Sequence, residues 1–577
     1  MKPVHNFFHI VFFLLLAELL YSQTPASKNQ FRSPLDIKMY LSGNFGELRA
    51  DHFHSGIDIK TQGVTGKKVY AAADGYISRI KIEAAGYGKT LYITHPDGYM
   101  TVYAHLDRFI PKVDKFVRDK QYQEKKHALN IFPPKNEFQF KQGDLIAFSG
   151  NSGYSFGPHL HFEIRETASQ YPLNVLLYGL EIEDNTPPRI YSICIYPCDE
   201  QSYINNINEK QFFPVKEVNG SYHLINNQNI ILTGKIGFGI EAYDLMEGSP
   251  NRCGLYSIEL LIDSIKHFSM RMDKFSFNDS RYINSFIDYE EKQKNNKNIH
   301  KTFIDQNNLL NVYNETKNSG IAEFLDDDMH SITFILKDAY LNATQLNFHV
   351  TSQSINQVSN PVKNNDYLQL MYWNTINTFE RDDIRLVIPQ RALYKDIQFT
   401  YSKSGIPAGF FSMVHHVHNI YTPLHLPGEL YLKPVNLPDS LNDKAVVVNA
   451  NNNGKWQYAG GEWVNGYVRT TILQFGKYAI TVDTIPPTIT PLNLDGSADM
   501  KDRTSIRFKI EDDLSGIQSY EGYIDNEWAL FEYDAKNNLL FYIFDPDKIT
   551  RGKNHALELY IVDNKDNISF YYTEFYW

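Results

Sequence analysis

Apolar and polar residues alternate along several short stretches of this chain, most clearly in HLHFEI at residues 159–164. Successive side chains of a strand point to opposite faces, so this pattern predicts a strand with one apolar face. The other face carries His159, His161 and Glu163. A Gly-Pro turn signal at 157–158 places the first histidine at the start of the strand, beside a loop. A half-buried strand with two surface histidines fits the same alternation.

Two turn signals, Asp-Gly at 74–75 and Pro-Asp-Gly at 96–98, separate short strand patterns upstream. In the strand after the second turn, alternation puts His105 on the same face as Thr101 and Tyr103. We therefore expect His105 on the polar face, at the end of an antiparallel hairpin. A structural histidine with satisfied hydrogen bonds is the alternative for a single residue of this kind.

Further upstream, His54 and Asp58 are four residues apart. An even separation puts both side chains on one face of an extended segment, as a helical turn also would. Gly56 and the Ile-Asp-Ile pattern that follows favour a strand. Taken alone, the pair could equally be a solvated histidine and aspartate at the edge of a loop.

Residues 108–140 interrupt the succession of strand patterns. This stretch is charged and aromatic, has helical character in its first part, and contains the Pro-Pro pair at 133–134. The strand pattern resumes after it, around residues 145–149. We interpret 108–140 as an insertion between two strands.

Composition supports a large, mainly β protein. The chain has 577 residues, which suggests three or four domains at about 100 to 200 residues each. It contains 39 Tyr and 37 Phe, residues that favour strands over helices. Its 56 Lys+Arg against 67 Asp+Glu give a formal net charge of −11 without any basic run, so nucleic acid is not an expected partner.

The first 22 residues are predicted to be a secretory signal peptide. The apolar run at 7–20 follows Lys2 and is short for a bilayer span, although an uncleaved anchor is the alternative. Leu20 is a poor match to the small residue expected before the cut, which leaves the cleavage site open. No later stretch is long and apolar enough to cross a membrane, so we expect an exported protein of the periplasm or cell envelope.

The chain has three cysteines, Cys194, Cys198 and Cys253. An odd number in an exported protein leaves at least one thiol unpaired within the monomer. An extended segment would hold Cys194 and Cys198 too far apart to join, so a bend or a pairing with Cys253 would be needed for a disulfide. Structural or free thiols are the favoured interpretation.

Three short patterns recur in the same order in the later part of the chain, which indicates two copies of one module. The recurring pairs are 184–190 with 483–489, 240–248 with 510–516, and 335–344 with 561–569. Short strands between Asp, Asn, Gly and Pro turns suggest immunoglobulin-like β-sandwiches. We predict such modules at 184–352, where the copy carries an insertion, and at 483–577, with a further β-domain of unknown role at 355–482.

Two clusters of polar residues in these modules contain side chains that can bind metal ions. Asp512-Asp513 and the aspartates of 563–566 could bind Ca2+, but they lack the spacing of a calcium loop, so Asx turns are favoured. The histidines in MVHHVHNIYTPLH, at 413–425, lack a carboxylate or cysteine at telling spacing. They are predicted to pack among aromatic strand residues.

Taken in chain order, the motifs H-x-x-x-D, Y-A-H-L and G-P-H-L-H-F-E-I resemble the lysostaphin and LytM type of zinc metallopeptidases, which cut peptide bonds in bacterial peptidoglycan. The resemblance covers residues 45–165 and implies a LytM-like antiparallel β-sheet domain, which we place at 30–180. It implies that His54, Asp58 and His161 bind Zn2+. It further implies that His105 and His159 are the catalytic pair.

The donor set is consistent with that resemblance. Two imidazoles and one carboxylate leave a fourth tetrahedral position open, as in a catalytic rather than a structural zinc site. Two further imidazoles could orient or deprotonate water and pass a proton to the leaving amine. By strand parity, Glu163 faces the site as a partner for an imidazole, although an exposed strand carboxylate is an equal alternative.

The expected function is therefore an exported zinc endopeptidase that hydrolyses stem peptides or cross-links of peptidoglycan during wall remodelling. The C-terminal sandwiches would position it or bind an envelope protein partner. A second hypothesis is a non-catalytic or latent protein that binds wall peptide or activates a partner hydrolase. A third is a zymogen in which Asn44, His52 or His127 supplies an extra zinc ligand.

Overall fold

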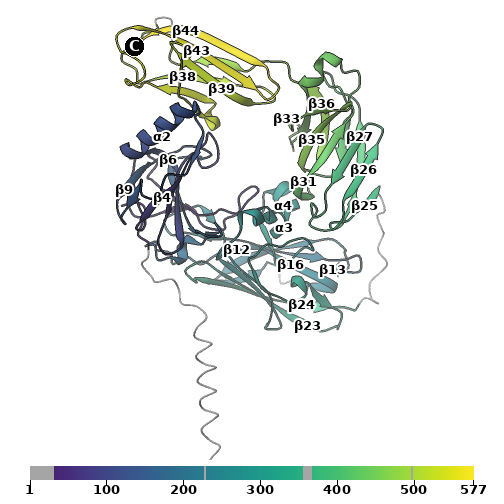
Figure 1. Cartoon of the computed structure of the whole chain (residues 1–577). Helices are drawn as coiled ribbons and strands as arrows, with labels where there is room; N and C mark the ends of the chain where they lie inside the picture. The colour runs from purple at the N-terminus through teal and green to yellow at the C-terminus, as the bar shows by residue number, and fades with distance from the viewer. Residues whose placement is uncertain (1–30, 226–228, 355–366, 452, 495–497) are drawn as a thin grey trace, which may run out of the picture.

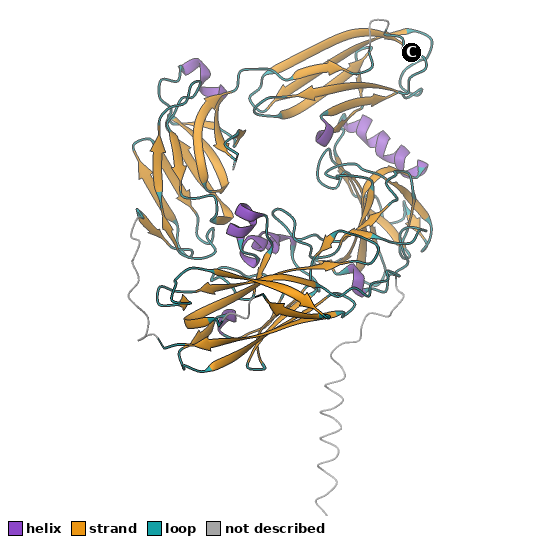
Figure 2. Ribbon diagram, turned by 180° about the vertical axis from the view of Figure 1, so that it is seen from behind, coloured by secondary structure: helices purple, strands orange, loops and turns teal. Residues whose placement is uncertain are grey.

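The computed structural model describes residues 31–225, 229–354, 367–451, 453–494 and 498–577. Strands dominate it, and the few helices are short (Figures 1 and 2). The predicted mainly β architecture with several β-sheet domains is confirmed, while the immunoglobulin-like character of the sandwiches stays a prediction. The predicted signal peptide lies outside the described residues. No helix within the described ranges is both long and apolar enough to cross a membrane.

Four β-rich units follow one another around a ring in Figure 1. We call them the N-terminal unit (β1–β11), the second unit (β12–β24), the third unit (β25–β36) and the last unit (β37–β44). Each has its own buried hydrophobic cluster. The ring closes where the last unit meets helix α2 of the N-terminal unit.

The N-terminal unit is one antiparallel sheet in the order β1-β2-β10-β6-β5-β4-β7, with β3, β8, β9 and β11 paired to its members. Its elements are β1 (Leu41–Gly43), β2 (Ile57–Lys60), β3 (Lys68–Tyr70), β4 (Gly75–Ile82), β5 (Lys89–Thr94), β6 (Tyr99–Phe109), α2 (Pro111–Glu124), β7 (Leu129–Ile131), β8 (Gln139–Phe140), β9 (Leu145–Ser149), β10 (His159–Glu166), β11 (Pro172–Leu173) and η1 (Val175–Leu177). Strand β10 begins at the first histidine, as the Gly-Pro signal predicts. It lies between β2 and β6, the two strands that bring the other candidate residues.

The segment 108–140 contains helix α2 and two short strands, so its predicted helical part is confirmed. Pro111 starts the helix, where its missing N–H costs nothing, and Lys125 ends it in the left-handed conformation. Val113 and Val117 are buried on one side, against the core of the sheet. The insertion therefore packs onto the N-terminal unit instead of standing apart from it.

The second unit is built around the long strand β16 and an extensive, mostly antiparallel sheet system. Its elements are β12 (Arg189–Pro197), β13 (Tyr203–Ile204), β14 (Gln211–Val218), β15 (Ser221–Leu224), β16 (Ile231–Leu245), β17 (Arg252–Cys253), β18 (Ser257–Ile262), β19 (Ile265–Arg271), η2 (Phe277–Tyr282), α3 (Ile283–Phe286), α4 (Tyr289–Asn295), β20 (Ile299–Lys301), β21 (Tyr313–Thr316), η3 (Asn318–Gly320), β22 (Ala322–Phe324), β23 (Met329–Lys337) and β24 (Ala343–Ser352). Phe45 and Phe53 of the N-terminal unit belong to its hydrophobic cluster. The loop that carries His54 is therefore anchored in the neighbouring unit.

The third unit packs two five-stranded sheets around a shared core. Its elements are β25 (Gln369–Met371), β26 (Asn377–Arg381), β27 (Ile384–Ile388), β28 (Ile397–Phe399), β29 (Tyr401–Ser404), β30 (Val414–Val417), β31 (Pro423–Leu432), η5 (Asp439–Lys444), β32 (Ala445–Ala450), β33 (Trp456–Tyr458), β34 (Glu462–Val464), β35 (Tyr467–Gln474) and β36 (Gly476–Val482). The histidines of 413–425 pack as expected: His415 bonds Tyr401 at 2.9 Å, and His425 stacks on Tyr282.

The last unit packs two four-stranded sheets, β37-β38-β42-β41 and β40-β39-β43-β44, around one core. Its elements are β37 (Thr488–Pro491), β38 (Ser505–Glu511), β39 (Ile517–Ile524), β40 (Glu527–Ala529), β41 (Phe531–Asp534), η6 (Ala535–Asn537), β42 (Leu539–Ile543), β43 (Asn554–Asp563) and β44 (Ile568–Tyr576).

Hydrogen bonds at the start of the second and last units follow the recurring sequence patterns. The side-chain amide of Asn342 donates to the backbone oxygen of Asp184 at 3.0 Å, and that of Asn567 donates to the oxygen of Asp483 at 3.1 Å. The recurring segments therefore make the same local structure in both units. All three cysteines are free thiols, in agreement with the sequence.

Candidate metal centre and active site

Three side chains from β2, β10 and the loop before β2 converge at one point. The Nε2 atom of His54 lies 3.1 Å from Oδ1 of Asp58 and 3.0 Å from Nδ1 of His161. The distance from His161 Nδ1 to Asp58 Oδ1 is 2.9 Å. The strand register explains the meeting, because Asp58 and His161 are direct cross-strand partners. All three side chains are buried.

The backbone fixes which nitrogen of His54 faces this point. Its Nδ1 is 2.7 Å from the backbone oxygen of Asn44, so Nδ1–H donates there and Nε2 is left as the acceptor. Gly56 allows the loop to approach β10, since a Cβ atom there would stand 2.3 Å from the oxygen of Phe162. A larger residue would push the loop, and His54 with it, away from the strand.

Glu163 holds the far side of His161. Its Oε1 lies 2.8 Å from His161 Nε2, which is the imidazole contact that strand parity predicts. The same oxygen accepts from Tyr87 at 2.6 Å, and Oε2 accepts from Arg165 at 2.5 Å. Ser55 donates to Oε1 as well, at 2.7 Å. The carboxylate is fully buried, so its charge is balanced by this network.

The prediction that His105 lies on the same face of its strand as Thr101 and Tyr103 is wrong. Tyr103 pairs with Phe162 and is buried in the core, so strict alternation would turn His105 away from His161. One extra residue in β6, opposite β5, makes a bulge there, and His105 has a positive φ of 57°. The bulge returns its ring to the side of His161, at 5.9 Å between centroids.

The rings of His105 and His159 lie 4.8 Å apart beside the buried group. Each is anchored through Nδ1 by a backbone oxygen, Ser152 O at 2.8 Å for His105 and Gly157 O at 2.9 Å for His159. Both rings therefore keep Nε2 free to act as an acceptor. That of His159 lies 3.4 Å from Asp58 Oδ1.

Burial and hydrogen bonding shift the pKa values of the groups at this site in opposite directions. Burial, together with the charges of His161 and His159, lowers the pKa of His105 to about 3. Although burial opposes it, hydrogen bonding to Asp58 and Glu163 raises the pKa of His161 to about 9. Burial likewise opposes ionisation of Asp58, but its histidine neighbours hold its pKa well below the usual range.

The buried group fits a zinc ion. One ligand atom from each of His54, Asp58 and His161 lies within 4.8 Å of the others, and each imidazole has its other nitrogen fixed by a protein oxygen. Two nitrogens and one carboxylate oxygen form the donor set that Zn2+ takes in catalytic sites.

The side chains of Asn44, His52 and His127, the possible extra zinc ligands of a zymogen, do not join the buried group of His54, Asp58 and His161. The side chain of Asn44 bonds both backbone atoms of Gly254, each at 2.8 Å. His52 is exposed and bonds Asp51, while His127 lines a separate cavity near Glu532. That expectation is therefore wrong for these three residues.

Two family models match parts of this chain. Residues 52–122 match the model of peptidase family M23. The N-terminal unit is an M23 peptidase domain. Residues 368–483, nearly the whole third unit, match the model of a Zu5-like domain.

Relatives of the M23 domain include both enzymes and an activator by name. An uncharacterized metalloprotease of Haemophilus influenzae is 32% identical over 127 residues, 22% of either chain. The DD-carboxypeptidase/endopeptidase Mpg of Neisseria meningitidis is 34% identical over 24% of this chain and 25% of its own. The murein hydrolase activator NlpD of Salmonella typhimurium is 32% identical over 25% of this chain and 30% of its own. The match thus spans between a fifth and a third of these relatives' lengths.

Among solved structures, the catalytic domain of lysostaphin from Staphylococcus simulans aligns with 22% identity and a TM-score of 0.17. That alignment covers 22% of this chain and 82% of the lysostaphin domain.

Arg49 is a neighbour of the M23 site that the sequence did not indicate. Its guanidinium donates to Asp58 Oδ2 at 2.8 Å, leaving Oδ1 for the buried group. Nothing in the run ELRADHFH marks it, because an arginine in a loop is usually solvated. It orients the carboxylate that carries one of the three converging atoms.

The last unit touches the rim of the M23 site. Lys536 in η6 donates to the backbone oxygens of Asn151 and Gly153, on either side of the residue that anchors His105. Lys89 and Glu532 form a 2.9 Å ion pair nearby. A cavity of about 250 Å³ lies at this junction. The loop that orients a candidate catalytic residue is therefore held from the far end of the chain.

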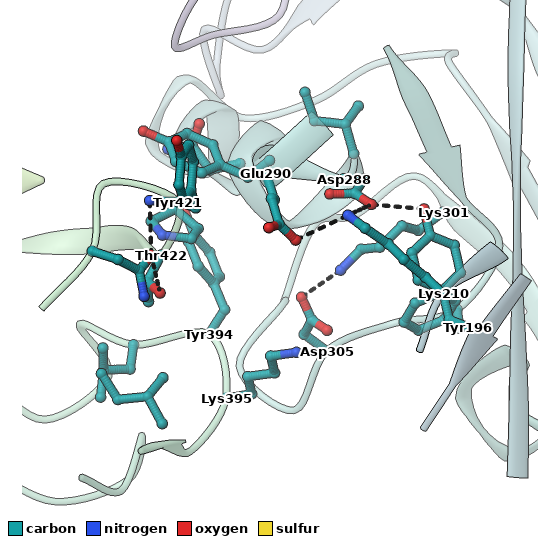
Figure 3. Close-up of a pocket in the computed structure, with 18 residues that line it drawn as sticks. Tyr196, Lys210, Asp288, Glu290, Lys301, Asp305, Tyr394, Lys395, Tyr421 and Thr422 are labelled. Atoms are coloured by element: carbon teal, nitrogen blue, oxygen red, sulfur yellow. Dashed lines mark hydrogen bonds and ion pairs between the residues drawn. The ribbon is translucent and has the colours of Figure 1, made fainter. Parts of the chain in front are cut away.

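A larger cavity, about 410 Å³, lies between the second and third units and is lined by charged side chains (Figure 3). Lys210 pairs with Asp288 at 2.8 Å and with Glu290 at 3.0 Å. Lys301 pairs with Asp305 at 2.6 Å. These charges neutralise one another, which is typical of a structural junction between units.

Proposed function

We propose that this chain is an exported zinc endopeptidase that hydrolyses peptide bonds in the stem peptides or cross-links of peptidoglycan. The observation that carries the proposal is the convergence of His54, Asp58 and His161 next to two further imidazoles, each anchored through Nδ1 by a backbone oxygen. A purely structural zinc site would have four protein ligands and no need of the second pair.

The three converging residues would hold the ion. When bound, Zn2+ supplies Lewis-acid chemistry that polarises a peptide carbonyl and acidifies water. Asp58 and His161 come from paired strands, so the sheet sets their spacing. Arg49 and Glu163 keep the outer atoms of these two ligands fixed.

His105 and His159 would handle the protons. Each donates Nδ1–H to a backbone oxygen, which fixes the tautomer that leaves Nε2 basic. One ring can then take a proton from the attacking water while the other hydrogen-bonds the developing oxyanion or gives a proton to the leaving amine. The strained backbone at His105 is the element that holds its ring on this side.

Peptidoglycan peptides are the proposed substrate because two relatives of the M23 domain from Vibrio cholerae are named peptidoglycan DD-endopeptidases. The predicted signal peptide supports a location in the periplasm or envelope, where this polymer lies. The remaining units would position the enzyme on the wall or bind an envelope protein.

A second candidate function is activation of a partner wall hydrolase, since one relative is named as such an activator. The position of the insertion at 108–140 does not support a blocked site. Helix α2 packs on its own sheet and pairs with the last unit, and within the described ranges no hydrogen bond or ion pair joins it to the five candidate residues.

Purified peptidoglycan distinguishes the two. The mature chain alone should release soluble peptides and create one new amino group for each bond cut, while His105→Ala should lose about 100- to 10,000-fold in rate and keep its zinc. Normal turnover in the variant would remove His105 from the mechanism. Release that requires an added hydrolase, and that survives His105→Ala, would support the activator instead.

A further inference from the structure

Three buried aspartates meet at the base of the second unit. Asp184 precedes β12, Asp244 lies near the end of β16, and Asp338 follows β23. One carboxylate oxygen of each lies within 4.8 Å of the others. Their exposed fractions are 7%, 1% and 1%, so water does not screen the three charges.

Two carboxylate oxygens of this cluster have no hydrogen-bond partner. Oδ2 of Asp184 and Oδ1 of Asp244 are both fully shielded from solvent and unpartnered. The hydroxyl of Tyr340 is buried and unpartnered as well, close enough for the three carboxylates to act on its charge. Buried polar atoms in native proteins are nearly always paired, so orphans gathered at one point indicate a missing ligand.

No positive side chain compensates the cluster. Within the described ranges, neither lysine nor arginine forms an ion pair with any of the three aspartates. Burial, with the charges of Asp338 and Asp184, raises the pKa of Asp244 to about 8. Burying several carboxylates together without a counter-charge is strongly unfavourable.

We propose that Asp184, Asp244 and Asp338 bind a hard divalent cation, with Ca2+ as the ion that fits. All three donors are carboxylate oxygens, which suit Ca2+ and Mg2+ and not the softer metals that take imidazole or thiolate. Adjacent backbone elements from three separate segments allow the flexible, oxygen-rich coordination that Ca2+ accepts more readily than Mg2+.

The last unit contains an equivalent cluster of three aspartates, which differs from the cluster in the second unit in its hydrogen bonds. Asp483, Asp512 and Asp563 also converge within 4.8 Å. There, however, the N–H of Ser515 donates to Asp483 Oδ2 at 3.1 Å, and no carboxylate oxygen of the three is a buried orphan. Asx-turn bonds satisfy that cluster, as the sequence predicts for Asp512 and Asp563.

A lysine adds to the difference. Lys565 stands two residues after Asp563, the position that Tyr340 holds after Asp338, and its charge acts on Asp483. The last unit thus carries an internal positive charge where the second unit has a neutral phenol. The duplicated unit is a natural control for the proposed site.

The location assigns the ion a structural task. Asp184 belongs to the segment that leaves the N-terminal unit, while Met246, Cys253 and Tyr340 pack in the hydrophobic cluster of that unit. A cation at the three aspartates would tie this segment to the ends of β16 and β23. It would fix the angle between the peptidase domain and the rest of the ring, independently of zinc and of catalysis.

Calcium binding to the full mature chain tests the inference. After metal removal and reloading with zinc, the protein should take up one Ca2+ per chain, measured by equilibrium dialysis. Its melting temperature should rise by about 3 °C or more at saturating Ca2+ and by less with Mg2+. Asp244→Asn should abolish both effects, while the matched variant Asp512→Asn should keep them.

The variants are chosen to fold. Asp244→Asn replaces a carboxyl whose charged form is disfavoured by burial and by its two acidic neighbours, so in calcium-free buffer it should melt no lower than the wild type. Asp184→Asn, in a segment outside the strands, is the second variant if Asp244→Asn proves unstable. Absence of calcium uptake, uptake that survives both substitutions, or loss of uptake in Asp512→Asn would overturn the site. A larger shift with Mg2+ would overturn the calcium assignment.

Discussion

Two clusters of this chain each bring three metal-binding side chains together, but they differ in the hydrogen bonds that surround them. In the M23 domain, His54, Asp58 and His161 meet between paired strands, and in the second unit three aspartates meet at strand ends. In the M23 cluster, each ligand has an outer atom held by a neighbour such as Glu163 or Arg49. In the aspartate cluster, two buried carboxylate oxygens have no hydrogen-bond partner among the described residues.

This difference indicates that the M23 cluster is organised for catalysis before metal binds, whereas the aspartate cluster needs a bound ion to offset its buried charge. Hydrogen bonds around the M23 cluster fix orientation and balance charge before any metal arrives, and two spare imidazoles lie beside it. Among the described residues, no lysine or arginine forms an ion pair with the three aspartates. The first arrangement suits zinc and turnover, and the second suits a calcium ion that joins two units.

Removing the imidazole of His161 should give the largest difference between the two clusters in metal binding. His161→Ala should lose zinc and all measurable peptide release, because it deletes one of the three ligands and removes one hydrogen-bond partner of the buried Glu163. Its calcium uptake should equal that of the wild type. Zinc analysis and calcium dialysis on one preparation check both, and equal zinc content in the variant would refute the ligand assignment.

A milder change should tune zinc without removing it. Glu163→Gln keeps an oxygen for His161 but loses the charge, so zinc affinity should fall about 10- to 100-fold in a chelator competition. The matched variant Glu166→Gln, on the same strand and bonded to Lys274, should change nothing. Equal affinities in both variants would show that the carboxylate does not support the ligand.

The smallest effect should come from the contact between the last unit and the M23 domain. Lys89 opposes the cost of burial and lowers the pKa of Glu532 below its usual 4.5. A lowered acid pKa stabilises the contact above pH 4.5, and this contribution is lost as the pH falls through the folded value. Amide exchange at β41 and α2, corrected for intrinsic rates, should therefore accelerate by about tenfold or less between pH 6 and 4.

Two variants sharpen that test. Glu532→Gln should exchange as fast at pH 6 as the wild type does once the pH has fallen below the folded pKa of Glu532, whereas Asp119→Asn should leave the profile unchanged, because its pair with Lys115 is exposed. A pH dependence that persists in Glu532→Gln would assign the effect to another group.

The sequence predicts the M23 site where local rules hold. Alternation along β10 places His159, His161 and Glu163 on one face, and that placement is what the structure contains. Alternation fails at His105, because one inserted residue and a positive φ reverse its direction, and neither is visible in a period-two pattern.

Residues brought together only by tertiary structure lie beyond such rules. Asp184, Asp244 and Asp338 are far apart in the chain, so no spacing marks them as a metal site, although the recurring patterns did mark the three segments that meet. Arg49 has no motif, and its role follows from the position of Asp58. The helix in 108–140 was predictable, but its packing against the last unit was not.

Zinc titration of the metal-free protein tests the central claim most directly. Aliquots of Zn2+ are added to the mature chain on purified peptidoglycan, and release of soluble peptides is followed. The account predicts no release without zinc, a linear rise, and a plateau at one Zn2+ per chain that Ca2+ cannot replace. Full release before zinc is added, or none after one equivalent has bound, would contradict it.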